Sequence, residues 1–110
     1  MPQINVQQVG LDMLNAAKTQ LGKHFADAKP FAEQAFRQLA DNLALITELK
    51  VTNQITEEQA RLHFEIFKSS TRIVLLTIEG LGVLAVEAAI NAALGVVADV
   101  VNTAIGFALL

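Results

Sequence analysis

The sequence predicts an all-α protein, a single helical domain over residues 1–110 built as a bundle of three to four helices. Through the first 72 residues, apolar side chains recur at the three- and four-residue steps of one helix face. The run Thr56-Glu57-Glu58-Gln59 has the form of a capping box, which marks a helix start in mid-chain. Residues 73–110 are rich in Ala, Gly and Val, and predict a long apolar C-terminal helix.

A first helix is expected over residues 5–28. Its apolar side collects Val6, Val9, Met13, Ala17, Leu21 and Phe25. Lys29-Pro30 is expected to end this helix, because the residue before a proline is pushed out of the helical backbone region. Pro30 then suits the first position of a second helix, because its fixed φ is already helical there.

A second helix is expected over residues 30–50. Its broad apolar stripe consists of Phe31, Ala35, Phe36, Leu39, Leu43, Ile46 and Leu49. The polar residues that follow, 51–54, form a short connection to the third helix. A link this short favours an antiparallel pair of helices.

A third helix is expected to start at the capping box, in which the Thr56 hydroxyl and the Gln59 amide each satisfy a backbone N–H. Its predicted inner face is Ala60, Phe64, Phe67, Thr71, Val74 and Ile78. Arg61 is expected to pair with Glu57 and Glu65, which lie four residues away on either side. The rest of the outer face, as far as Arg72, is expected to be ordinary solvated surface.

The helix is expected to break at Glu79-Gly80-Leu81-Gly82, because two glycines so close together cost about 2 kcal/mol of helix propensity. A fourth helix over residues 83–108 then follows. The rival is one unbroken helix over residues 57–108, which would be about 78 Å long at 1.5 Å per residue.

The composition indicates more apolar surface than a small domain hides alone. Hydrophobic residues make up 53% of the chain and charged residues 17%, against a usual range of about 45–50% and about 25%. Residues 1–72 form a neutral amphipathic part that holds all eight basic residues and eight of the eleven acids. Residues 73–110 hold three acids and no basic residue. This apolar segment is expected to need a second burying surface: another copy, a partner groove or lipid.

On a helical wheel, residues 83–107 separate by side-chain size. One half carries Val83, Val86, Ile90, Val97, Val100, Val101 and Phe107. The other half forms a predicted association seam of Ala85, Ala88, Ala92, Gly95, Asp99, Asn102 and Gly106. Small residues let two helix backbones approach closely, so the seam predicts a homo-oligomer. The alternative is that this segment is the central helix of a soluble bundle, in which its small residues merely accommodate crowded neighbours.

The polar residues of the apolar segment are expected to need partners. Glu87 and Asp99 are expected to find structural partners, and a buried polar or ion site of Glu87, Asn91 and Asp99 along the seam is the alternative. In lipid, the Val, Leu and Ile residues of 83–101 would favour insertion by about 3–5 kcal/mol, and the two acids would cost about 5–7 kcal/mol together. A lone span is therefore unfavourable. A shared water-filled lumen would lower the cost of the acids, which leaves a cation-preferring pore as an alternative.

The sequence shows no motif of a catalytic or cofactor-binding site. The chain has no Cys, which excludes thiolate metal sites and cysteine nucleophiles, and its net charge of −3 argues against nucleic-acid binding. His24 and His63, the two histidines, are expected to be structural or surface residues. Gly80-Leu81-Gly82 lacks the further glycine and lysine of a nucleotide-binding loop. No cofactor, metal or small-molecule substrate is therefore expected.

The sequence as a whole predicts a non-enzymatic structural or interaction module that self-associates through its C-terminal helix. The alternative is a membrane-active helical protein in which residues 73–110 insert into lipid or form a pore. The N-terminal residues lack the basic start and apolar core of a secretory signal, so a cytoplasmic protein is expected, with membrane association as the alternative.

Overall fold

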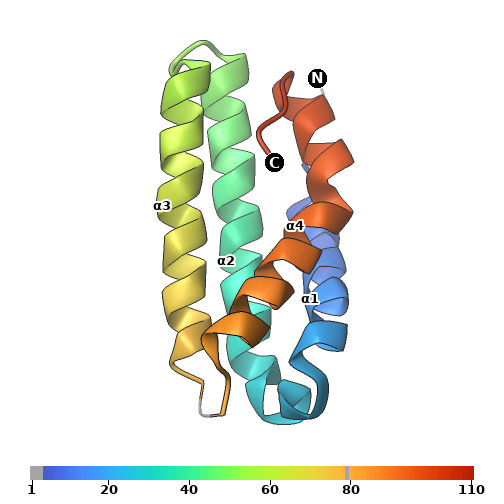
Figure 1. Cartoon of the computed structure of the whole chain (residues 1–110). Helices are drawn as coiled ribbons and strands as arrows, with labels where there is room; N and C mark the ends of the chain where they lie inside the picture. Colours follow the sequence, from blue (N-terminus) through green and yellow to red (C-terminus); the bar gives the residue numbers. More distant parts are fainter. Residues whose placement is uncertain (1–3, 79) are drawn as a thin grey trace.

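The computed structural model describes residues 4–78 and 80–110, and these residues form four α-helices and no strand (Figure 1). The helices are α1 (Val6–Leu21), α2 (Phe25–Val51), α3 (Glu57–Leu76) and α4 (Val83–Ile105). A short 3-10 helix, η1 (Gly22–His24), joins α1 to α2. The prediction of an all-α chain is confirmed.

The helices form an elongated bundle in which successive helices run in alternating directions (Figure 1). Its principal extents are 42 × 22 × 18 Å. The most extensive packing joins α1 to α4 and to α2, whereas α3 packs mainly on α2 and only lightly on α4. α3 is therefore an edge helix, and much of its surface has no neighbour within the chain.

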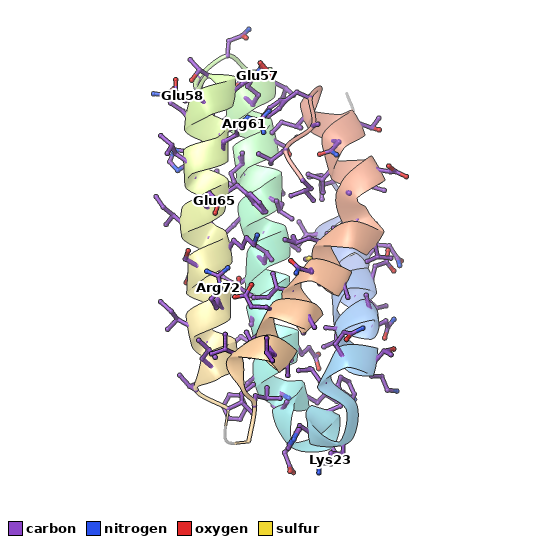
Figure 2. All side chains as sticks on the ribbon, viewed as in Figure 1. Lys23, Glu57, Glu58, Arg61, Glu65 and Arg72 are labelled. Carbon is purple, nitrogen blue, oxygen red and sulfur yellow. The ribbon has the colours of Figure 1, made fainter. Side chains whose placement is uncertain are left out.

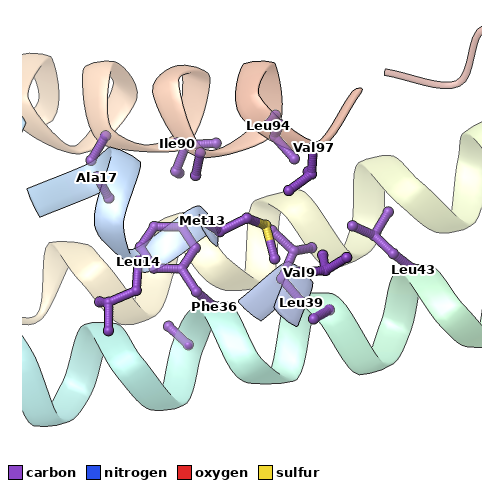
Figure 3. Packing of buried hydrophobic residues seen from close by; sticks show 14 of the residues in the cluster. Val9, Met13, Leu14, Ala17, Phe36, Leu39, Leu43, Ile90, Leu94 and Val97 are labelled. Carbon is purple, nitrogen blue, oxygen red and sulfur yellow. The ribbon is translucent and has the colours of Figure 1, made fainter. Parts of the chain in front are cut away.

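The core lies between α1, α2 and α4. Met13 of α1 and Phe36 of α2 are fully buried at its centre. Ile90, Leu94 and Val97 project from α4 towards the side chains of α1 and α2 (Figure 3). Burying each side chain of this size stabilises the fold by about 1.5–3 kcal/mol. The apolar half of α4 thus contributes directly to the stability of the bundle.

The boundary between the first two helices differs from the prediction. α1 ends at Leu21 rather than at residue 28, because Gly22 adopts a positive φ of 55°. Pro30, expected to begin a helix, lies inside α2 in its second turn. As the sixth residue of α2 it lies beyond the four amides that have no helical partner, so it removes one backbone hydrogen bond of the second turn. Glycine, and not proline, therefore sets this boundary.

The two boundaries of α3 agree with the prediction. The backbone N–H of Gln59 donates to the Thr56 hydroxyl at 3.1 Å, and the Gln59 side chain accepts from the Thr56 N–H at 2.9 Å. α3 ends at Leu76 and α4 begins at Val83, so the unbroken-helix alternative is wrong. Gly80 has a φ of 90°, a conformation that favours glycine. Glu79, part of the predicted break, lies outside the described residues.

The predicted inner face of α3 is correct except at one position. Ala60, Phe64 and Thr71 are buried, and Phe67 is half-buried. Val74 is 39% exposed, and its neighbour Leu75 is fully buried in its place. The apolar stripe of α2 is likewise buried or half-buried apart from Phe31, which is 54% exposed.

Candidate functional site

The predicted association seam lies on the outward face of α4. The buried residues of this helix are Val86, Ala89, Ile90, Ala93, Leu94, Val97, Val101, Ala104 and Ile105. None of the seven seam residues is among them: Ala85, Ala88, Ala92 and Asn102 are half-buried, and Gly95, Asp99 and Gly106 are exposed. The predicted seam therefore lies on the side of α4 away from the core.

Larger apolar side chains border this small-residue face. Leu84 is 87% exposed, Val96 54% and Val100 53%. A Cβ built on Gly95 would meet no atom within 4 Å, so the surface at the middle of the face is open. A second helix could approach the α4 backbone closely here, with the larger residues at the sides of the contact.

The large residues of α4 do not need a partner, contrary to the expectation that the apolar segment exceeds what the other helices can cover. Val86 and Ile90 are completely buried, with 0% of their surface exposed, and Val97 is 1% exposed. α1 and α2 cover them within the same chain. Among the large residues predicted to lie together, Val83 and Val100 remain exposed. The hydrophobic excess therefore does not by itself require association.

Within one chain, Glu87, Asn91 and Asp99 do not come together in a buried polar site. Glu87 is paired with Arg72 of α3. The Arg72 Nε and Nη2 groups both donate to the Glu87 carboxylate, and the Nη2 contact measures 3.5 Å. The two side chains remain 32% and 35% exposed. Asn91 and Asp99 are exposed and lie further along the helix. Glu87 thus has a structural partner, as expected for a carboxylate in an apolar helix, and this partner comes from another helix, which a wheel of α4 alone does not contain.

Two predicted seam residues have roles inside the chain. The Asn102 side-chain oxygen accepts hydrogen bonds from the backbone N–H groups of Leu109, at 2.9 Å, and Leu110, at 3.0 Å. Gly106 ends α4 with a φ of 93°. Together they turn the C-terminal residues back against the helix. The surface left for a partner is therefore the part from Ala85 to Asp99.

The same C-terminal segment explains why the ion pairs predicted for Arg61 are absent. Arg61 donates to the carbonyl oxygen of Ala108 at 3.1 Å, and its guanidinium lies 5.0 Å from the centre of the Phe107 ring. Within residues 4–78 and 80–110, Arg72 and Glu87 form the one ion pair. Figure 2 shows Arg61 and Arg72 at two levels of α3. Arg72 joins this edge helix to the first turns of α4, and Arg61 joins it to the residues that follow α4.

The outer face of α3, predicted to be ordinary solvated surface, carries exposed apolar residues. Leu62, Ile66 and Ile73 are 59%, 64% and 63% exposed. Their spacing of four and seven residues is a helical stripe, and that spacing was the signal available in the sequence. Together with Glu65, Ser69, Ser70 and Val74, they line an open groove of about 520 Å³.

Both histidines have structural surroundings. A Cβ on Gly80 would lie 3.0 Å from the His24 ring, so this ring packs against the chain at the α3–α4 connection. His24 also borders an open hollow with Asp27, Phe31 and Thr77. The His63 ring stacks on Phe67 with 6.2 Å between centroids. The described part of the chain brings together no three His, Cys, Asp or Glu side chains that could hold a metal ion.

α4 is long and apolar enough to cross a membrane. It has 23 residues, and its most apolar stretch of 18 residues has a mean hydropathy of 1.8; within the described ranges it is the one such helix. In the bundle, 33% of its most apolar stretch is buried. Length and composition alone do not distinguish a membrane span from the core helix of a soluble bundle.

Comparisons of the chain with protein-family models, with characterised proteins and with solved structures found no match.

Proposed function

We propose that the chain is a non-enzymatic structural and interaction module that associates with further copies of itself through the outward face of α4. One observation supports this most strongly: the seam residues Ala85, Ala88, Ala92 and Gly95 are all unburied, and large exposed apolar residues border them. Such a face costs free energy in water and lets a second backbone come close.

An antiparallel contact between two α4 helices, centred near Ala92, fits the charges of this face. Each Asp99 would lie seven residues from the centre, so the two carboxylates would be about 20 Å apart at 1.5 Å per residue. At physiological salt the interaction of exposed charges is screened over about 8 Å. A parallel contact would instead place the two Asp99 carboxylates against each other.

The test compares Ala92→Glu with Gln34→Glu, a substitution of the same charge at an exposed position of α2. Sedimentation velocity without detergent measures the mass of each variant. Ala92→Glu should dissociate the assembly, because it places two acids at the centre of the contact, whereas Gln34→Glu should sediment like the unmodified chain. If the two variants sediment alike, α4 does not form the contact.

The second candidate is a membrane-active protein in which α4 enters lipid. The length and mean hydropathy of α4, and the absence of Lys and Arg from it, favour this candidate. Val96 is exposed, so Val96→Arg leaves the soluble bundle folded while raising the cost of insertion by about 3 kcal/mol. Dye release from anionic liposomes should then fall for Val96→Arg and not for Leu45→Arg on α2. Equal release by both variants would exclude insertion of α4.

A further inference from the structure

The outer face of α3 has the residue pattern of a coiled-coil seam. Ile66 and Ile73 take the a positions of a heptad, and Leu62, Ser69 and Leu76 take the d positions. The apolar side chains of this set are exposed, from 39% at Leu76 to 64% at Ile66. We define these five residues as the α3 seam. It is separate from the buried stripe of the same helix, which packs on α2.

We propose that the α3 seam pairs with the α3 seam of a second copy in antiparallel orientation. In an antiparallel pair, a positions face d positions of the other helix. One register places Leu62 opposite the second copy's Ile73 and Ile66 opposite its Ser69. Exchange of the two copies gives the same contacts, so this register satisfies the two-fold symmetry of an isologous dimer.

The charges beside the seam favour the antiparallel orientation. Glu65 and Arg72 both take g positions, and antiparallel helices bring g positions of the two copies together. Each Glu65 would then face the Arg72 of the other copy, on both sides of the two-fold axis. A guanidinium has five N–H donors, and Glu87 engages two of those of Arg72, so donors remain for Glu65. In a parallel pair Glu65 would face Ser70 and gain no charge partner.

The size of the surface predicts a weak dimer. α3 has 20 residues, which is about 30 Å at 1.5 Å per residue. One helix face of this length is smaller than the roughly 800 Å² per partner of a standard stable interface.

Pairing through the α3 seam does not depend on association through α4. If both faces operate, two different two-fold contacts on one chain generate a closed tetramer or an open filament.

Cysteine cross-linking tests the pairing and its orientation. The chain has no Cys, so Leu62→Cys and Ile73→Cys each introduce a single thiol on an exposed position. Oxidation of an equimolar mixture should give a dimer that joins position 62 to position 73, which peptide mass mapping identifies. The same thiol in two copies is about 16 Å apart in this register, so each variant alone should cross-link slowly. Preferential 62–62 and 73–73 products, or no dimer, would overturn the proposal.

A second measurement tests the pairing with Leu62 and Ile73 unchanged. Ile66→Lys should raise the dissociation constant of the α3 pair at least about tenfold, because it places a charge in the middle of the seam. Leu45→Lys, at a 48% exposed position of α2, is the matched control. Both are measured by sedimentation equilibrium in the Ala92→Glu background, which removes association through α4. Equal dissociation constants for the two variants would overturn the pairing of α3.

Discussion

Gly95 offers a perturbation whose effects on stability and on association should have opposite signs. It is the thirteenth of the 23 residues of α4, and a Cβ added there meets no atom within 4 Å. A glycine inside a helix costs about 1 kcal/mol relative to alanine and about 0.5 kcal/mol relative to glutamine. Gly95→Ala and Gly95→Gln should therefore both stabilise the single chain, by those amounts.

The two variants differ in what they leave on the outward face. Alanine keeps the face small, so Gly95→Ala should still associate. Glutamine places a long polar side chain where two backbones would meet, so Gly95→Gln should be monomeric. The comparison separates bulk from charge, because neither alanine nor glutamine is ionised.

Two assays check these expectations. Thermal unfolding at the lowest workable concentration should show a midpoint increase of about 4–8 °C for Gly95→Ala and about half of that for Gly95→Gln. Sedimentation velocity at high concentration should show assembly for the first variant and monomer for the second. If Gly95→Gln is stabilised but assembles like the unmodified chain, the outward face of α4 is not the contact. If Gly95→Gln is destabilised, the face is not open.

Three further substitutions test contacts that hold the bundle together. Thr56→Ala removes the capping box and should lower the free energy of unfolding by about 1 kcal/mol in urea titrations, whereas Thr103→Ala, an exposed control, should change it by less than about 0.5 kcal/mol; equal losses would deny the cap its role. Gly80→Ala forces a positive φ and crowds His24, and should cost about 1–3 kcal/mol; an unchanged unfolding midpoint would contradict this backbone conformation. Glu87→Gln should cost at most about 1 kcal/mol, because the ion pair is about one third exposed; a loss several times larger in the same titration would mean that the pair is more buried than described.

Local signals in the sequence predicted the boundaries of α3 because both depend on a few adjacent residues. A capping box needs a hydroxyl and an amide three residues apart, and Thr56 and Gln59 supply both. The break before α4 needs glycine, and Gly80 has the positive φ that explains the choice. The first boundary was missed because two signals competed, and Gly22 proved stronger than Pro30.

Contacts between distant parts of the chain could not be read from periodicity. Arg72 and Glu87 lie on different helices, and Arg61 contacts residues near the C-terminus rather than its neighbours on α3. A helical wheel separates two faces correctly but does not say which face the rest of the chain covers. For α4 this left the burial of Val86 and Ile90 unpredicted, and for α3 it hid the exposed stripe on its outer face.

The mass of the unmodified chain in detergent-free solution tests the central proposal most directly. Sedimentation equilibrium over a range of concentrations should give a weight-average mass that rises above the 11.8 kDa of one chain. A constant mass of 11.8 kDa up to the highest soluble concentration would contradict self-association through either α4 or α3.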